Sequence, residues 1–406
     1  MRRERGIGAC VLVCVLLLAG IARAEEQQWL QYRTATEPYR VLGGYVGGRA
    51  CEVTAEAPEG VSLPKLTGAK PLFAKWVTPM VKAGFLWVAL DQSKKQGPHD
   101  RLYVDLSGDG GLADESPVEA RGSDADTAGL PADYERTEFG PVKVLFKGDD
   151  GPVTYHLNVK FYSYQSRTQL YLAPAGWYEG TVSLGGKEHK CRLLDYNANG
   201  SFSDVSLNPN GSDRIELDLK GDGTFTRFFV GRYLQPASGG PCFRLEVARD
   251  GASVRFTPAG ELPMGTVQVP NDPAFMELTG ENGHFRRRTA DGPVCVPAGT
   301  YRLKYIDFKR TDGKDVKWEL VADAFPEDMA FEVKEGLTTE VVVCDPVVAS
   351  LTMGERERTV SFSHQLKGTN AENVYLLRSG QRPPAPKLRI TNADKSYNRT
   401  FSFEYG

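Results

Sequence analysis

The chain has 406 residues, of which 41% are hydrophobic and 25% are charged, and its 49 Lys and Arg residues face 52 Asp and Glu residues. This is the composition of a globular protein, and the length is ample for two to four domains. The nearly balanced charge excludes the concentrated basic face that nucleic-acid binding needs, since the basic cluster Arg286-Arg287-Arg288 is too short to supply it.

The N-terminus predicts export. Three arginines in the first five residues precede an apolar stretch at 7–21, which ends in Ala22-Arg23-Ala24. A secretory signal peptide over residues 1–24 is expected, because the apolar run is short for a membrane span and small residues suit cleavage; a retained membrane anchor is the alternative. Cleavage would remove four of the 49 basic and one of the 52 acidic residues and leave a net charge of −6. We expect a secreted, periplasmic or cell-surface protein with no membrane span after signal removal.

Short apolar-alternating runs separated by Gly, Pro, Asn and Asp follow from end to end. They predict a mainly β fold, with several β-sandwich or β-barrel-like units in tandem and few helices. The clearest strand segments are 142–146, 153–162, 168–172, 243–247, 301–308 and 340–343. Gly185-Gly186 is expected to join two strands as a hairpin. The segment Lys70–Met80 is expected to be the helical or turn-rich exception.

The chain divides into four expected units after the signal peptide. They are a β-rich unit with an Asp-rich loop at 25–125, a β-rich unit with Asp-rich loops at 136–235, a β-sandwich at 239–346, and C-terminal strands at 347–406. The polar segment between the first two units has small and acidic residues that cannot build a core. The last 60 residues complete the third unit or form a small Ig-like module alone.

One pattern occurs twice. DRLYVDLSGDGGL, beginning at Asp100, recurs as DRIELDLKGDGTF, beginning at Asp213. In each copy a strand-like run leads into Asp-x-x-Gly-Asp-Gly, where glycines permit a tight turn beside two carboxylates. Each copy also follows a Leu-Asp pair, at 90–91 and 194–195, so we expect two units of related plan.

A third loop, DYNANGSFSD, places Asp195, Asn197 and Asn199 at positions one, three and five and Gly200 at position six. Calcium takes six to eight oxygen ligands, and this spacing resembles the EF-hand and dockerin loop. Position twelve is Ser206 in place of the bidentate acid, so the closing carboxylate must come from Asp204, two residues earlier, or from Asp213 or Asp218 folding back from the next strand. Weak binding, about 10⁻⁴ to 10⁻³ M, is therefore expected.

The two copies of the repeat differ as calcium loops. The first has oxygen-bearing side chains at positions one, three and five and acids beyond, whereas the second has Lys220 at position three. The expected calcium ligands are Asp105, Ser107, Asp109, Asp114, Asp195, Asn197, Asn199, Asp204, Asp213, Asp218 and Asp222. No EF-hand helices flank the loops, so they read as joints between strands. The alternative is ordinary turns without metal, in which Asp, Asn and Gly predominate for backbone reasons.

Two segments of the third unit carry a further resemblance. VPAGTYRLKYIDF at 296–308 and FEVKEGLTTEVVV at 331–343 resemble prealbumin-like and carboxypeptidase-regulatory-like β-sandwich modules. The resemblance implies a sandwich facing an extracellular or periplasmic space. The chain as a whole resembles uncharacterised secreted bacterial β-rich proteins with such Asp-rich loops, which implies no known activity.

Five cysteines remain after the signal peptide, namely Cys51, Cys191, Cys242, Cys295 and Cys344. Disulfides persist outside the cytoplasm, but the odd number leaves at least one thiol unpaired. Free buried thiols and one or two bridges are both compatible with this spacing. If there is a bridge, Cys295 with Cys344 is the first expectation, because both lie in strand-like runs of one unit.

Catalytic motifs are absent from the sequence. Asp126-Thr127-Ala128-Gly129 interrupts the aspartic-protease turn with an alanine, and the histidines are scattered, with His156 and His189 the pair to inspect. Trp177-Tyr178 beside Glu179 suggests a sugar platform, although alternating aromatic residues usually pack in a core. The sequence favours a structural or binding protein with calcium-stabilised loops and an extracytoplasmic protein or glycan as partner. The alternative is a secreted carbohydrate-active or carbohydrate-binding protein.

Overall fold

The computed structural model describes residues 26–121, 131, 134–148, 151–165, 167–323, 325–326, 328–357 and 359–405. Within them the one α-helix is α1 (Pro38–Leu42), accompanied by 3₁₀ turns at Pro209–Gly211 and Thr289–Asp291. The prediction of a mainly β fold is confirmed. The described part of the chain has no helix with the length and apolar character that a membrane crossing requires. The expected signal peptide and the segment 126–129 lie outside the described residues.

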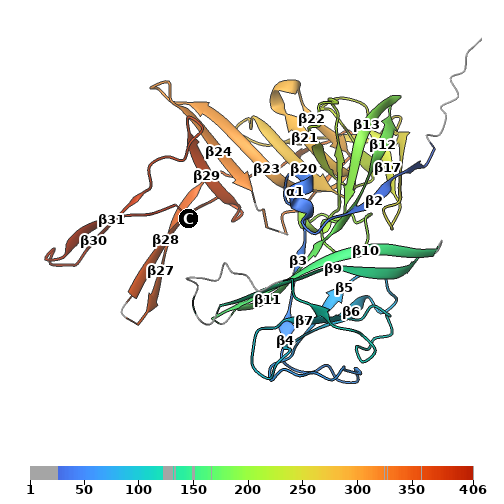
Figure 1. Cartoon of the computed structure of the whole chain (residues 1–406). Helices are drawn as coiled ribbons and strands as arrows, with labels where there is room; N and C mark the ends of the chain where they lie inside the picture. Colours follow the sequence, from blue (N-terminus) through green and yellow to red (C-terminus); the bar gives the residue numbers. More distant parts are fainter. Residues whose placement is uncertain are drawn as a thin grey trace, which may run out of the picture.

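Four sheets form the N-terminal two thirds (Figure 1). The first contains β4 (Val53–Thr54), β5 (Leu72–Val77), β6 (Phe85–Asp91), β7 (Arg101–Val104) and β8 (Val118–Glu119). The second contains β3 (Arg49–Cys51), β11 (Arg167–Pro174), β10 (Gly151–Tyr164) and β9 (Glu135–Gly148). The third contains β15 (Thr226–Phe229), β14 (Arg214–Leu217), β13 (Lys187–Leu194), β12 (Gly176–Leu184) and β2 (Gln31–Thr34). The fourth contains β1 (Gln28–Trp29), β18 (Ser253–Pro258), β17 (Phe243–Val247) and β16 (Tyr233–Leu234).

Three further sheets follow. One contains β22 (Val294–Pro297), β19 (Met264–Gln268) and β26 (Thr338–Glu340). The largest contains β21 (Gly283–Arg288), β20 (Phe275–Gly280), β23 (Gly299–Thr311), β24 (Lys317–Asp323), β29 (Asn373–Arg378), β28 (Thr359–Lys367) and β27 (Val348–Arg356), with β25 (Phe331–Val333) paired to β23. The last is the hairpin of β30 (Lys387–Thr391) and β31 (Asn398–Ser402). Figure 1 shows the β27–β28 and β30–β31 hairpins projecting from the body, and almost all their side chains are half-buried or exposed.

The repeated pattern occupies the same place in two meanders. β5 to β8 and β12 to β15 are each four consecutive antiparallel strands, and the Asp-x-x-Gly-Asp-Gly loop follows the third strand in both. The upstream Leu-Asp pairs differ in register, because Asp91 lies opposite Arg101 whereas Leu194 lies opposite Arg214. Asp91 is therefore the last paired residue of β6, whereas Asp195 lies one residue beyond the last residue of β13 that pairs with β14.

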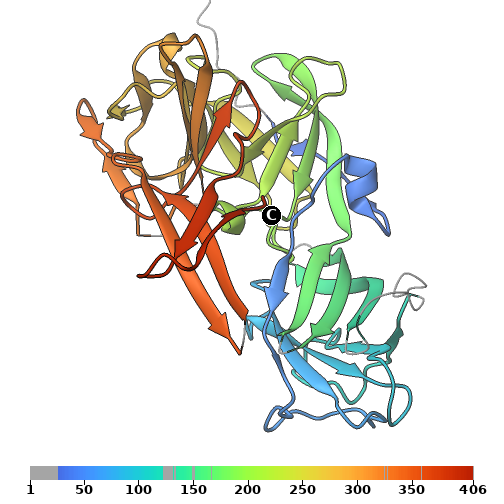
Figure 2. The same ribbon diagram turned by 90° about the vertical axis from the view of Figure 1, so that its left-hand side faces the viewer.

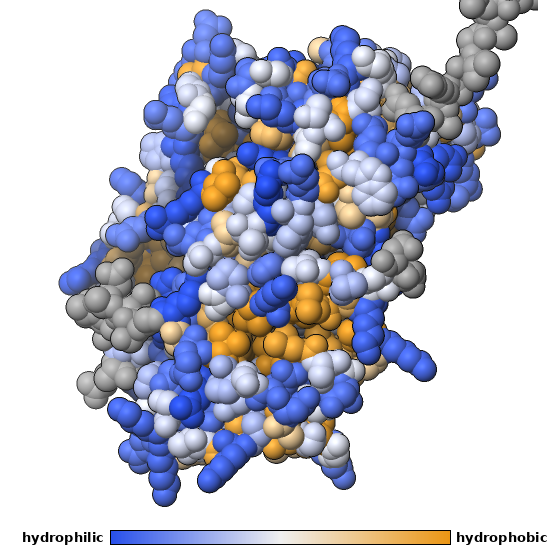
Figure 3. Space-filling view, turned by 45° about the vertical axis from the view of Figure 1, so that its right-hand side comes forward, coloured by the Kyte–Doolittle hydropathy of each residue, from blue (hydrophilic) through white to orange (hydrophobic). Residues whose placement is uncertain are grey.

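Two hydrophobic cores run through these sheets. The first joins buried residues from Leu30 to Phe256, so the segments on both sides of the polar stretch near 125 share it, and the second runs from Val267 to Val374. Figure 2 shows the light-blue and cyan strands of the first sheet below the light-green strands of the third sheet. Figure 3 shows an apolar patch at the height of β5, β9 and β10, and Val77 and Leu145 are exposed apolar residues of these strands.

One local prediction is confirmed and another is wrong. Gly185 and Gly186 join β12 to β13 with φ values of 59° and 79°, a left-handed turn that glycine adopts without strain. Lys70–Met80 was expected to be helical or turn-rich, but it contains strand β5. There Phe73 and Trp76 are buried while Lys75 and Val77 are exposed, and pairing with β6 outweighs the ambiguous local pattern.

Candidate metal centre

Strand register brings two aspartates of different segments together. β13 and β14 are antiparallel, with Leu194 opposite Arg214 at the end of the pairing. Asp195 directly follows the last residue of β13 and Asp213 directly precedes the first residue of β14, so the two residues flank the same end of this strand pair. Both carboxylates are fully buried. The closing acid that the calcium-like loop lacks at position twelve is thus available from the start of the next strand.

Asp195 organises its own loop. Its Oδ1 accepts a hydrogen bond from the backbone N–H of Asn199 at 3.2 Å, and its Oδ2 accepts one from Gly200 N at 2.7 Å. The hydroxyl of Tyr155 in β10 donates to Oδ2 at 2.8 Å. A carboxylate of one sheet therefore receives a donor from another, a contact that no sequence motif indicates.

Asp213 binds the same loop from the other side. Its Oδ1 accepts from Tyr196 N at 2.9 Å and its Oδ2 accepts from Asp204 N at 2.7 Å. Of the three residues considered as closing acids, Asp204 and Asp213 therefore join the Asp195 loop. Asp218 does not, because its carboxylate is bonded within its own loop.

Two asparagine side chains converge on Asp204. The amide nitrogens of Asn197 and Asn199 donate to Asp204 Oδ2 at 2.8 and 2.6 Å. Asn197 Oδ1 is buried and has no hydrogen-bond partner among the described residues. We call Asp195, Asn197, Asn199, Asp204 and Asp213 the Asp195 cluster. It contains three carboxylates and two amides, which are side chains of the kind that bind calcium.

The cluster places carboxyl groups close together in a buried site. Burial raises the pKa of Asp195 to about 7, and the charge of Asp204 adds to this effect. The pKa of Asp213 is also well above its ordinary value, first because of burial and then because of the charges of Asp195 and Asp204. Within the described residues, none of the three carboxylates forms an ion pair with a Lys, Arg or His side chain. A cation among them would therefore lower the electrostatic cost of burying ionised carboxylates and reduce the repulsion between them.

Arg214 follows Asp213 directly but does not supply that cation. Its guanidinium lies 3.8 Å from the ring centre of Tyr196 and 3.5 Å from that of Phe229. Its hydrogen bonds go to the carbonyl oxygens of Ser212, Asp213 and Pro209. Held between two aromatic faces, it stabilises the start of β14 and forms no ion pair with the carboxylates among the described residues.

The loop that carries the cluster is packed inside the first core. Trp76 Nε1 of β5 donates to the carbonyl oxygen of Ala198 at 2.7 Å, and Ala198 is fully buried. Phe202 is 1% exposed and its ring lies edge-on to that of Tyr178 at 5.1 Å. A ligand bound to this loop would stabilise the contact between several sheets.

The two copies of the repeat form closed turns. Asp105 accepts from the backbone N–H groups of the third and fifth residues after it, at 2.8 and 3.1 Å, and Asp218 does the same at 2.7 and 2.9 Å. The second aspartate of each turn, Asp109 or Asp222, accepts from the residue two positions further on, at 2.7 and 2.8 Å. The shared sequence thus encodes a shared hydrogen-bond pattern.

The predicted ligands of these turns do not converge as those of the Asp195 cluster do. Ser107, Asp109, Asp114 and Asp222 are exposed. Glu115, which was not among the predicted ligands, closes the first turn by accepting from Leu106 N and Ser107 N at 2.6 and 2.9 Å. Glu115 is at position eleven of the loop, which is not a ligand position in the calcium-loop pattern.

No three His, Cys, Asp or Glu side chains in the described ranges are placed to hold a metal ion by themselves. A cation in the Asp195 cluster would therefore need its asparagine and backbone oxygens as well. Comparisons with known proteins give no significant match to any protein family, curated protein or solved structure. Function must therefore be inferred from the residues of this chain.

Other predicted features have structural explanations. Trp177 and Tyr178 are 4% and 8% exposed, so this pair offers no open sugar platform. His156 lies 3.2 Å from the Tyr32 hydroxyl, and His189 Nδ1 lies 3.1 Å from the carbonyl oxygen of Asp218, so each has its own partner. The five described cysteines are free thiols, and the bridge expected between Cys295 and Cys344 is not formed.

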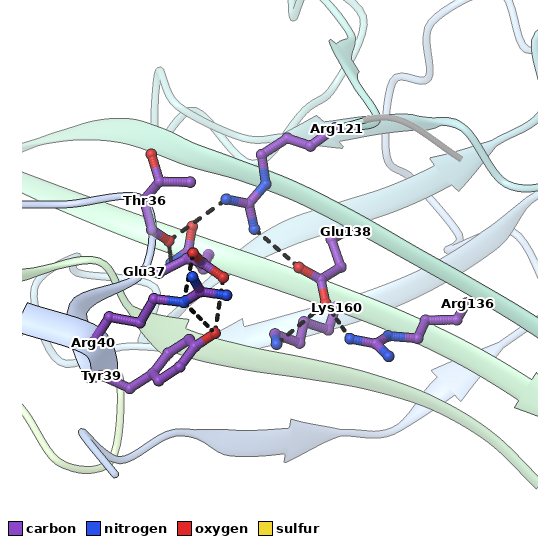
Figure 4. Close-up of polar contacts among 9 residues, drawn as sticks. Thr36, Glu37, Tyr39, Arg40, Arg121, Arg136, Glu138 and Lys160 are labelled. Atoms are coloured by element: carbon purple, nitrogen blue, oxygen red, sulfur yellow. Dashed lines mark hydrogen bonds and ion pairs between the residues drawn. The ribbon is translucent and has the colours of Figure 1, made fainter. Parts of the chain in front are cut away.

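In a second charged cluster, one carboxylate lies close to three basic side chains. Glu138 of β9 lies 3.2 Å from Arg121, 2.7 Å from Arg136 and 3.2 Å from Lys160 (Figure 4). Arg121 also reaches the carbonyl oxygen of Thr36. The cluster fastens the segment before α1 to β9 and β10, and its half-exposed groups make it a surface network of modest stability.

Proposed function

We propose that the protein is an exported structural or binding protein in which one calcium ion at the Asp195 cluster stabilises the first hydrophobic core. The observation that supports this most is the convergence of Asp195, Asp204 and Asp213 on one buried loop without a cationic partner among the described residues. Export is supported by the N-terminal sequence. The partner of such a protein would be another extracytoplasmic protein or a glycan.

Calcium fits this donor set better than softer metals do. The cluster offers carboxylate and amide oxygens and no His or Cys ligand, and calcium accepts six to eight oxygens in flexible geometry. Backbone oxygens and water would complete the shell. Asn197 and Asn199 donate to Asp204, so at least one amide must turn its oxygen inward before it can bind the ion. This rearrangement supports weak affinity, about 10⁻⁴ to 10⁻³ M.

The test is the thermal midpoint of the full mature chain in calcium and in chelator. A ligand present at a hundred times its Kd stabilises the native state by about 2.7 kcal/mol. Calcium at 100 times the Kd should therefore raise the midpoint by several degrees. An equal concentration of magnesium should act less, because it requires stricter octahedral geometry.

Asp204→Asn is the informative variant. It removes one charge but keeps an acceptor oxygen for the two amides, so the fold should persist in chelator while the calcium response falls at least tenfold in apparent affinity. Asp222→Asn is the matched control, because Asp222 is exposed and lies in the other turn. Equal midpoints in calcium and chelator for the wild-type chain would overturn the proposal.

A further inference from the structure

Two of the five thiols share one cavity. Cys242 and Cys295 both line a space of about 440 Å³. Cys242 lies just before β17 of the fourth sheet, whereas Cys295 lies in β22, which belongs to the sheet beside the second core. Cys295 is exposed and Cys242 is half-buried. The cavity therefore places two thiols from different sheets around one solvent-connected space.

The buried guanidinium of Arg287 lines the same cavity. Arg287 is 6% exposed and donates through Nε and Nη2 to the carbonyl oxygen of Cys295, at 3.2 and 3.1 Å. Burial raises the pKa of the Cys242 thiol, and the charge of Arg287 opposes this effect. Burial lowers the pKa of Arg287, and its interactions with Cys242, Tyr301 and Cys295 oppose this effect. A fixed positive charge close to a thiol favours the thiolate, which is the nucleophile of disulfide exchange.

We propose that Cys242 and Cys295 are a redox pair that closes into a disulfide by exchange with the disulfide of a low-molecular-weight thiol or of a thiol oxidoreductase. This inference goes beyond the calcium proposal and does not depend on it. The other thiols are placed differently. Cys51 and Cys191 are buried in the first core, and Cys344 lines a separate cavity with Trp318.

The exchange is balanced in two steps. The Cys295 thiolate attacks one sulfur of the oxidant RSSR, forms a mixed disulfide and releases RS⁻. The Cys242 thiolate then attacks the Cys295 sulfur and releases the second RS⁻. The two thiols lose two protons and two electrons in total, the electrons reduce RSSR to two thiols, and one S–S bond is formed in the protein.

Closure requires Cys242 to move into the cavity. The preceding segment, Ser238-Gly239-Gly240-Pro241, also lines the cavity, and Gly239 has a φ of 69°. Glycines in this turn allow backbone rearrangement that bulkier residues would resist. The resulting bond would connect the strand pair β17–β18 with β22 and so fasten the first core to the second.

The experiment uses the full chain treated with glutathione disulfide, followed by alkylation and mass spectrometry. The expected product has lost two hydrogen atoms and yields a peptide pair joined through Cys242 and Cys295. Closure should also raise the thermal midpoint by several degrees relative to the reduced chain, since the bond restricts the unfolded state. Reduction should reverse both changes.

Two variants separate this pair from other thiol chemistry. Cys242→Ser should stop at a glutathione adduct on Cys295, whereas Cys344→Ser should close as the wild type does. A glutathione adduct on wild-type Cys295 without closure, or alkylation of both thiols after oxidation, would overturn the proposal. So would a bridge from Cys295 to Cys344. The wild-type result decides the question even if one variant fails to fold.

Discussion

Asp195 and Asp213 flank the same end of the β13–β14 ladder, and both are fully buried. Each uses its two carboxylate oxygens to accept backbone N–H groups of the loop from Tyr196 to Asp204. The loop is therefore folded around two buried carboxyl groups. This relationship explains why a cation would stabilise the first core and why loss of either carboxylate would disturb the loop.

Removing the tyrosine hydroxyl that faces Asp195 tests the inter-sheet contact. Tyr155 is fully buried and donates to Asp195 Oδ2. Tyr155→Phe should lower the free energy of unfolding by about 1 to 3 kcal/mol, because hydrogen bonds to charged groups are stronger than neutral ones. Urea unfolding measures the change. Tyr164→Phe is the control, since Tyr164 is more exposed and should change stability little; equal effects would contradict the assignment.

The two copies of the repeat should respond alike to mutation. Asp105 and Asp218 each accept two backbone N–H groups, one through each carboxylate oxygen. Asp105→Asn and Asp218→Asn replace one of these oxygens by an NH₂ donor, so each should lower the free energy of unfolding by about 1 to 3 kcal/mol. Asp109→Ala and Asp222→Ala each remove an exposed acceptor of one backbone N–H and should cost less. Denaturant unfolding of the four variants checks this order. Unequal costs for Asp105 and Asp218 would show that the shared sequence does not give shared energetics.

The contact between the two cores should be sensitive to acid. His284 of β21 lies 3.3 Å from Glu277 and edge-on to Phe229, with Arg286 and Lys304 nearby. Burial lowers the pKa of His284 to about 4. Burial raises the pKa of Glu277, but its hydrogen bond with His284 and the charges around it outweigh this and lower it to about 2.

The sign follows from proton uptake. Between the ordinary pKa of His284, 6.5, and its folded value of about 4, the unfolded chain binds a proton that the folded chain does not. The contribution of His284 to stability should therefore fall as the pH falls through this window, by about 2 kcal/mol between pH 6.5 and 5, while the raised pKa values of Asp195 and Asp213 act in the opposite sense. Glu277 titrates below it. Because Asp195 and Asp213 are present in both proteins, the difference between the urea midpoints of wild type and His284→Gln isolates His284, and wild type should lose stability relative to the variant as the pH falls from 6.5 to 5; parallel profiles would contradict this explanation.

Part of the candidate site could be predicted from the sequence, but the way in which strands assemble it could not. Spacing identified Asp195, Asn197 and Asn199, because a loop of this kind is local. The spacing did not identify the closing acid. The β13–β14 register places Asp213 beside Asp195, Asp204 is hydrogen-bonded to Asp213, and Asp218 is bonded within its own turn. Tyr155 had no signal at all, since its contact joins residues 40 positions apart.

The same reasoning applies to the fold. Alternating runs and the Gly185-Gly186 turn predicted strands and a hairpin that the structure contains. The prediction for Lys70–Met80 was wrong because the spacing of its aromatic residues fits either a helix or a strand, and pairing with β6 decides between the two. The sharing of one core by segments on both sides of residue 125 depends on contacts distant in sequence, which local patterns do not encode.

The most direct measurement is a crystal structure of the mature chain grown in calcium. We expect an ion with six to eight oxygen ligands among Asp195, Asp204 and Asp213, with at least one of the neighbouring asparagine amides turned toward it. Density that shows those carboxylates bonded only to protein N–H groups, Asn side chains and the Tyr155 hydroxyl at saturating calcium would contradict the account.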